Sequence, residues 1–204
     1  MPEGSTLLNL VSSAKEPEHA WPVYRALWAE LTNPDAPRPP VLLALDGLSH
    51  IMKISDYRSQ AFELIHSHDL ALVRHFTEAL SGAIKLPHGG AIIAATSRGN
   101  APKRASVDLS LAQRLAEQEG RDVPPADLYL RGYDERVAAV LKSVEVLKVN
   151  GISKTEARAL MEYWAASGVL RTKVDTLTVA DRWATGGHGI VGEMERAALL
   201  SMRL

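Results

Sequence analysis

Two apolar runs that end in polar residues constrain the fold of this chain most strongly. Val41 to Leu45 (VLLAL) runs into Asp46-Gly47, and Ala91 to Ser97 (AIIAATS) ends on two hydroxyl residues. Between the runs, apolar residues recur at helical spacing from about Leu72 to Leu80. Because the first run carries no polar residue, we expect a strand that is buried on both faces. Two such strands joined by a helix predict a parallel βαβ unit, and hence an α/β fold.

The remaining patterns predict helices around this unit and a third strand. Helices are expected over residues 6–15 behind Ser5 as N-cap, and over residues 18–31, 109–119 and 134–141. Residues 143–149 (SVEVLKV) alternate strongly enough to predict the third strand. The predicted organisation is an N-terminal helical and proline-rich segment (1–40), an α/β core (41–150) and a small helical appendage (151–204).

The appendage contains helical patterns only. Ser153 and Glu156 (SKTE) have the spacing of a capping box and open a helix with one apolar face, on which Trp164 is the largest residue. We expect this face to pack on the α/β half. Two more helices are predicted, near residues 175–183 and 192–202.

Composition excludes several classes of function. The chain has 204 residues, suited to one domain with a small appendage, and no cysteine, which excludes disulfides, thiolate catalysis and cysteine-ligated zinc. Its formal net charge is -1, so RNA can be contacted only through local groups of charge. No apolar run approaches the roughly 18 residues of a membrane span.

Polar residues at the strand ends are the candidates for nucleotide chemistry. Asp46 can hold Mg²⁺ directly or through water, and Thr96 or Ser97 can sense a terminal phosphate or position a water. The alternative is that Asp46 only opens a turn and Thr96 only caps a loop. The sequence has no G-x-x-x-x-G-K-[ST] phosphate loop, and Gly47 stands where many such nucleotidases carry a second acid. Hydrolysis is therefore not expected.

Two other groups of residues invite a functional interpretation. Arg98, Lys103 and Arg104 follow the second strand and are candidates for contact with RNA or nucleotide phosphate, or else form a solvated loop. The histidines His66, His68 and His75 suggest a metal, but on a single helix their spacing does not serve one ion. Beyond a possible Mg²⁺ at Asp46, no metal site is predicted.

Long ordered strings resemble a known family. They are RPPVLLALDGLSHIMKISDYRS, IHSHDLALVRHFTEALSG, LPHGGAIIAATSRGN, GYDERV and GISKTEARALMEYWAASGVL. Together, from about Trp21 to Met202, they resemble the C-terminal half of the fungal-type death-associated protein 3 family of mitochondrial small-subunit ribosomal proteins. The resemblance implies a P-loop, AAA-like GTP-binding fold, partial here, with a lid-like helical appendage. It also implies a place in the mitochondrial ribosome, with ribosomal RNA and ribosomal proteins as partners and neither membrane nor DNA.

The resemblance also implies which parts of a nucleotide site this sequence carries. Asp46, Thr96 and Ser97 match the family's nucleotide and magnesium positions, but the family's phosphate loop lies upstream. The chain thus resembles a fragment, a truncated copy or a gene model begun at an internal methionine, and its first residues, without arginine and with several acids, are no import signal. We expect the three positions to be vestigial, with GTP or GDP and Mg²⁺ bound only in the full-length family.

The predicted function is therefore that of a structural constituent of the mitochondrial small ribosomal subunit, and not of an enzyme. Two alternatives stay open at this point. One is a GTPase or nucleotide-dependent regulator, including an apoptosis-linked one. The other is an α/β interaction module that works outside the ribosome.

Overall fold

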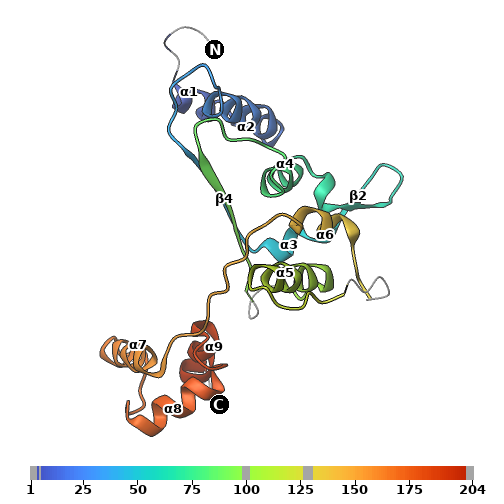
Figure 1. Ribbon diagram of the computed structural model, residues 1–204. Helices are drawn as coiled ribbons and strands as arrows, with labels where there is room; N and C mark the ends of the chain where they lie inside the picture. Colours follow the sequence, from blue (N-terminus) through green and yellow to red (C-terminus); the bar gives the residue numbers. More distant parts are fainter. Residues whose placement is uncertain (1–3, 5, 98–101, 126–130, 201–204) are drawn as a thin grey trace. The chain divides into compact units, whose positions relative to one another are not determined.

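The computed structural model describes residues 4, 6–97, 102–125 and 131–200. They belong to two compact units, Met1–Val146 and Leu147–Leu204, shown in Figure 1. The predicted N-terminal segment, residues 1–40, is part of the first unit. Within the described residues, no helix combines the length and the hydropathy that a membrane crossing requires.

The first unit is built on a small parallel sheet. Strands β1 (Val41–Asp46) and β4 (Gly90–Ala95) pair in parallel, in register from Val41 opposite Gly90 to Asp46 opposite Ala95. Gly90 has φ +142°, and a Cβ there would lie 2.0 Å from the carbonyl oxygen of Val41, so only glycine allows this close start of the pair. The predicted α/β class and the parallel pairing of the two apolar runs are confirmed.

In the part of the first unit that is described, helices cover one face of this sheet. Figure 1 shows α3 (Leu48–Ile51), α4 (Ala71–Leu80), α5 (Ala105–Gln118) and α6 (Glu135–Leu141) on the same side of β4. Leu43, Leu45, Ile92 and Ala94 point into the core formed by Leu48, Met52, Phe76, Val107, Val137 and Leu141. On the other face Leu42 is 64% exposed and Ile93 52%. The prediction that β1 is buried on both faces is therefore wrong.

The predicted third strand is absent from the described residues. Residues 144–149 form no strand, and side chains of α5 bind backbone groups of two of them, Val144 and Val146. Arg114 Nε donates to the Val144 carbonyl (2.9 Å), and Gln118 accepts from the Val146 N–H (2.8 Å) and donates to its carbonyl (3.3 Å).

A hairpin that the sequence did not reveal lies between β1 and α4. Strand β2 (Ile54–Arg58) pairs antiparallel with β3 (Leu64–His66), and the 3₁₀ helix η1 (Ser67–Asp69) follows. The helical pattern read from the sequence thus becomes regular α-helix only at Ala71. His66 and His68 consequently lie at a strand end and in a 3₁₀ turn, and not on one α-helix.

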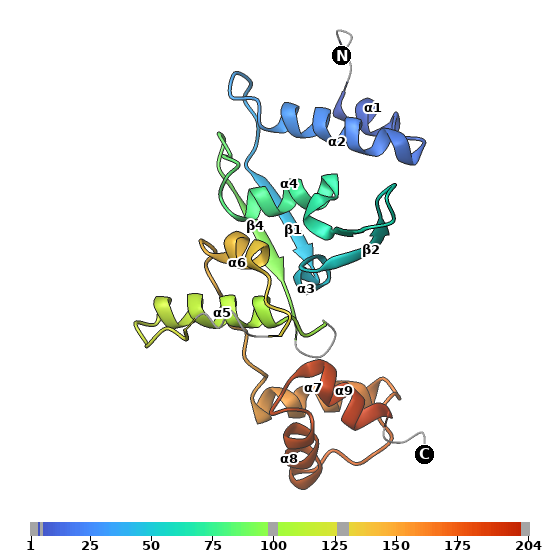
Figure 2. The same cartoon turned by 90° about the vertical axis from the view of Figure 1, so that its right-hand side faces the viewer.

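Two helices precede the sheet, as Figure 2 shows: α1 (Leu7–Ser12) and α2 (Pro17–Leu31). Thr6 is the N-cap of α1, because its hydroxyl accepts from the Asn9 N–H (3.2 Å), while Ser5, the predicted N-cap, lies outside the described residues. Helix α2 starts with proline at its first position, where the missing N–H costs nothing.

The second unit consists of helices with a core of their own. They are α7 (Lys154–Ala166), α8 (Thr176–Thr185), α9 (Val191–Glu195) and the π-helical turn η2 (Arg196–Leu200). The capping box of Ser153 and Glu156 is confirmed. Trp164, predicted to pack on the α/β half, packs on the core of its own unit, which comprises Ala157, Met161, Leu170, Val179, Met194 and Ala198.

Candidate functional site

The carboxyl edge of the β1–β4 sheet collects the three residues that the sequence selects for nucleotide chemistry. Asp46 lies opposite Ala95 in the parallel register, which places Thr96 and Ser97 directly beside it. All three are exposed. The convergence follows from the topology, since parallel strands of equal register end at the same edge.

The hydroxyl of Thr96 is already engaged. Its Oγ1 lies 2.7 Å from Ser49 Oγ, so that the residue after β4 is tied to α3, the helix after β1. Gly47 is the N-cap of α3 with φ +76°, a backbone conformation that glycine adopts more readily than an acidic residue. At the position where many nucleotidases carry a second acidic residue, this chain therefore has a glycine that makes a tight turn into α3.

These residues do not make a magnesium site by themselves. Asp46 brings one carboxylate, and Mg²⁺ in nucleotide sites is held jointly by carboxylate, hydroxyl and substrate phosphates. The described residues contain no group of three or more His, Asp or Glu side chains suited to a metal ion. The donor set at this edge does not fit the ion without phosphates, and the sequence lacks the loop that would hold them.

The basic candidates lie before α5. Arg98 falls outside the described residues. Lys103 is exposed, whereas Arg104, the N-cap residue of α5, is half-buried. Its Nε is shielded from solvent and has no hydrogen-bond partner within the part of the chain that is described. Lys103 is thus better placed than Arg104 to meet a phosphate.

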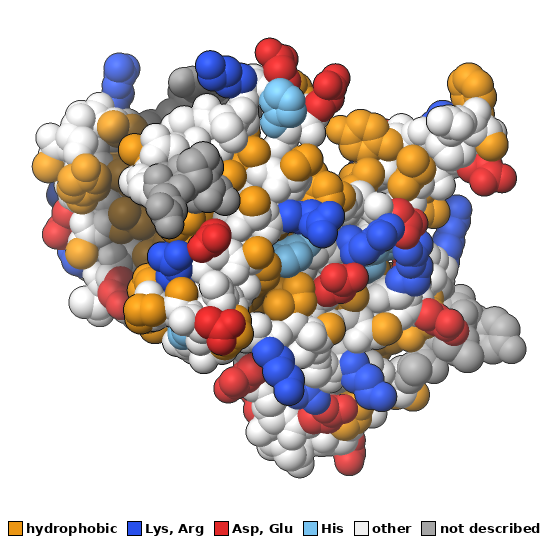
Figure 3. Space-filling model, turned by 90° about the horizontal axis from the view of Figure 1, so that it is seen from above, with side chains coloured by type: hydrophobic (Ala, Val, Ile, Leu, Met, Phe, Trp, Pro, Cys, Tyr) orange, Lys and Arg blue, Asp and Glu red, His pale blue; other side chains and the backbone are white. Residues whose placement is uncertain are grey.

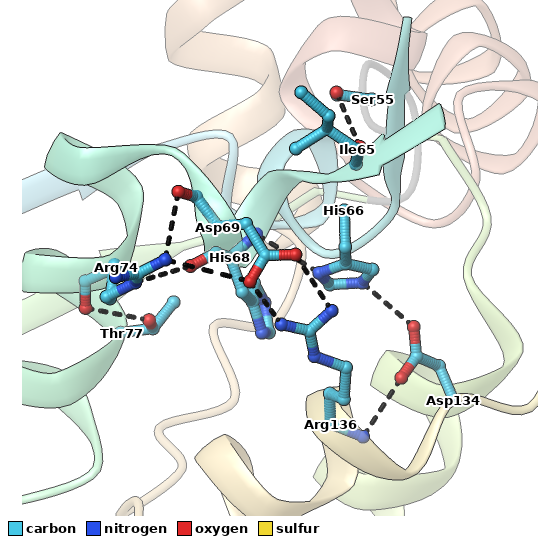
Figure 4. A network of polar contacts seen from close by, with 9 residues as sticks. All are labelled: Ser55, Ile65, His66, His68, Asp69, Arg74, Thr77, Asp134 and Arg136. Carbon is cyan, nitrogen blue, oxygen red and sulfur yellow. Dashed lines mark hydrogen bonds and ion pairs between the residues drawn. The ribbon is translucent and has the colours of Figure 1, made fainter. Parts of the chain in front are cut away.

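The structure also forms a polar network that sequence reasoning missed, drawn in Figure 4. His66 accepts at Nδ1 from the His68 N–H (3.1 Å), so its Nε2 carries the proton and donates to Asp134 Oδ2 (2.9 Å). Both ring nitrogens are used, which leaves none for a metal or a substrate. The motif HSHD and the Asp that precedes α6 were visible in the sequence, but not their pairing.

An ion pair runs beside this contact. The Asp69 carboxylate accepts from Arg136 through Nη2 (2.6 Å) and Nη1 (3.1 Å), and the hydrogen bonds to Arg136 lower the pKa of Asp69. His68 is buried, and its Nε2 lies 3.2 Å from Met52 Sδ. Burial is the main cause that lowers the pKa of His68 to about 4, and the electrostatic effect of His66 is the second. The network joins β3 and η1 to α6, and it has the character of a structural clamp.

Taken together, these features define an α/β protein with a polar strand edge and no complete catalytic constellation in the described part of the chain. The family model described as mitochondrial ribosomal death-associated protein 3 matches residues 1–197, and the chain belongs to this family.

Two named relatives agree with this membership. Small ribosomal subunit protein mS29 of Neurospora crassa is 58% identical over 205 residues, which cover 100% of this chain and 44% of that protein. Small ribosomal subunit protein mS29 of Schizosaccharomyces pombe is 25% identical over 135 residues, or 66% of this chain and 26% of that protein. The chain thus spans less than half the length of these relatives.

Proposed function

We propose that this chain is a structural constituent of the mitochondrial small ribosomal subunit. The observation that carries the proposal is 58% identity along the whole chain to a protein named as a small ribosomal subunit protein. Identity at this level over the full length of the chain supports the same structural role. The site of action that follows is the ribosome of the mitochondrial matrix.

The partners in this role are the ribosomal RNA of the small subunit and neighbouring ribosomal proteins. With a net charge of -1 the chain has no long-range attraction for RNA, so binding depends on local groups. Lys103 at the start of α5 is one such group because it is exposed. Arg98 and Arg104 are the other two candidates in the same stretch.

Nucleotide has at most a secondary part in this proposal. Asp46, Thr96 and Ser97 supply one carboxylate and two hydroxyls, while most phosphate contacts in such sites come from a glycine-rich loop and its lysine. This sequence has no such loop. We propose that the edge is vestigial here and that the contact between Ser49 and Thr96 joins α3 to the segment after β4.

A chimaera tests the ribosomal role. The matching segment of Neurospora crassa mS29 is replaced by this chain with an epitope tag, and mitochondrial extracts are sedimented through a sucrose gradient. We expect the tag in the small-subunit fractions. A control with Val137→Asp, which places a charge at a fully buried position of the first core, should lose that association.

Tagged chimaera found only in ribosome-free fractions, in amounts equal to the native protein, would contradict the proposal. It would favour an interaction module that works outside the ribosome.

A further inference from the structure

A groove with a volume of about 390 Å³ lies between α2 and α4. We call it the α2–α4 groove; its principal lining residues are Trp21, Arg25 and Trp28 of α2 and Ala71, Arg74 and His75 of α4. The residues recur at helical spacing on both helices, so the groove follows one face of each. Ala29 and Ala71 also line it, and their side chains are small.

Trp21 and Trp28, which line the groove, belong to a stack of aromatic rings. Along α2 the ring centroids of Trp21 and Tyr24 lie 5.8 Å apart, and those of Tyr24 and Trp28 6.3 Å. The His75 ring stands edge-on to this stack, 4.6 Å from Trp28 and 5.2 Å from Tyr24. The rings hold one another in place, so their faces need little ordering before another flat ring binds.

The charge of the groove is positive. Burial lowers the pKa of His75, so that the imidazole is neutral near pH 7. Arg25 is exposed and has no carboxylate within ion-pair distance among the described residues. Glu78 is the acidic residue of the lining. Two guanidinium groups thus outnumber one carboxylate.

Arg74 is held in position beside Asp69, whose carboxylate it shares with Arg136. Its Nη2 donates to the Asp69 carbonyl (3.2 Å), while the Asp69 carboxylate is 3.8 Å away and already bound by two nitrogens of Arg136. In Figure 3, which looks onto the α1–α2 end, Lys and Arg side chains lie next to histidine and hydrophobic side chains.

We propose that the α2–α4 groove binds an unstacked base of single-stranded RNA, with an adjoining phosphate at Arg25 and Arg74. Indole faces bind any base by stacking, and guanidinium groups bind the phosphate that every nucleotide carries. The Glu78 carboxylate repels phosphate but accepts a hydrogen bond from the exocyclic amine of a base, which orients the nucleotide. The inference rests on the proposed function, since that role supplies the RNA, and it adds a contact surface distinct from Arg98, Lys103 and Arg104.

Fluorescence anisotropy of a labelled, unpaired RNA oligonucleotide with the 204-residue chain tests the proposal. Ala71→Leu fills the groove at an exposed helical position without changing charge. We expect it to weaken binding by about 5-fold or more, with an unchanged salt dependence. Arg25→Ala should weaken binding. It should also make the negative slope of log affinity against log salt less steep by about 0.7, the value for one phosphate contact on a single strand.

Arg171→Ala is the matched control, because it removes an equally exposed arginine from the second unit. It should bind RNA like the parent chain, and all three variants should keep the parent's unfolding midpoint. Wild-type chain that does not bind the RNA, or groove variants that bind as tightly as the parent, would overturn the proposal.

The chimaera separates this inference from the ribosomal role. If the Ala71→Leu chimaera fails to enter small subunits although RNA binding by the isolated chain is intact, the groove takes a protein segment and the base-binding proposal is wrong. If RNA binding is absent while the unmodified chimaera sediments with small subunits, the inference fails and the ribosomal role stands.

Discussion

At the scale of single residues, Asp134 has two tasks in the first unit. Its Oδ1 accepts from the Arg136 N–H (2.9 Å) and so caps α6, while its Oδ2 accepts from His66 Nε2. The N-cap bond satisfies one of the free N–H groups at the helix start, and the second bond satisfies a buried imidazole. One side chain therefore fixes both the beginning of a helix and its attachment to the hairpin.

Asp134→Ala should lower the free energy of unfolding by about 2 kcal/mol, because it removes a helix cap and leaves a buried ring N–H unpaired. Asp134→Asn should cost only about 1 kcal/mol, since its carbonyl oxygen still caps α6 while its amide is a poor partner for His66. Urea unfolding followed by circular dichroism measures both. Equal losses for the two variants would show that the N-cap bond contributes nothing, and an Asp134→Asn variant as stable as the parent would show that the contact with His66 contributes nothing.

His68 should make stability depend on pH. Its pKa is lowered to about 4 in the folded chain, while in the unfolded chain it returns to about 6.5. The unfolded state then binds more protons between these values, so stability is fully present above pH 6.5 and is lost as the pH falls toward 4. The loss amounts to about 2–3 kcal/mol.

His68→Leu should reduce the difference in the free energy of unfolding between pH 7 and about pH 4.5, as measured by urea unfolding. His75 still contributes in the same direction, because burial lowers its pKa too. His19→Leu, at an exposed position, is the control that should behave like the parent. An unchanged slope in His68→Leu would argue that His68 is not the residue that titrates.

At the scale of elements, structures that have a local sequence pattern could be predicted, and structures that depend on distant residues could not. The capping box at Ser153 is a four-residue pattern, and the parallel strands follow from two apolar runs with a helix between them. The β2–β3 hairpin has no such pattern: its turn places Phe62, and not Gly or Asn, at φ +62°. The alternation of residues 143–149 is genuine, but the described residues offer no strand beside it.

The candidate sites also differ in whether the sequence alone could predict them. That Asp46 and Thr96 share an edge follows from strand direction, which the sequence reveals. The α2–α4 groove depends on how two helices pack, and the bond between His66 and Asp134 joins residues 68 positions apart. Neither has a short sequence pattern, because each depends on tertiary packing.

Gln118→Ala should expose the backbone of Val146. Gln118 makes both hydrogen bonds of that residue's backbone, so its loss should speed exchange of the Val146 amide hydrogen and cost about 1 kcal/mol. Hydrogen exchange followed by NMR measures the effect. Gln113→Ala, which instead frees the Pro124 carbonyl, should leave Val146 protected; equal protection in all three proteins would contradict the assignment.

At the scale of the whole molecule, each of the two units has its own core, and the three candidate nucleotide residues lie in the first unit. Their carboxylate and hydroxyls come from β1 and from the residues after β4. Nothing in this sequence supplies a phosphate loop. The family membership therefore does not by itself make this chain a nucleotide-binding protein.

Titration with a fluorescent GTP analogue in the presence of Mg²⁺ should show no saturable binding by the 204-residue chain, because the main phosphate contacts are missing. Asp46→Ala should give the same flat titration. Saturable micromolar binding that this substitution abolishes would mean that the edge is a working site.

The clamp between the hairpin and α6 has a consequence for biosynthesis. His66 leaves the synthesising ribosome long before Asp134, because 68 positions separate them along the chain. At about 5–20 residues per second, roughly 3–14 seconds pass between the synthesis of His66 and that of Asp134. During that interval the nascent hairpin has no anchor, and Met52, Phe76 and the other early core residues lack Val137 and Leu141. The core of the first unit therefore cannot be completed until α6 has been synthesised.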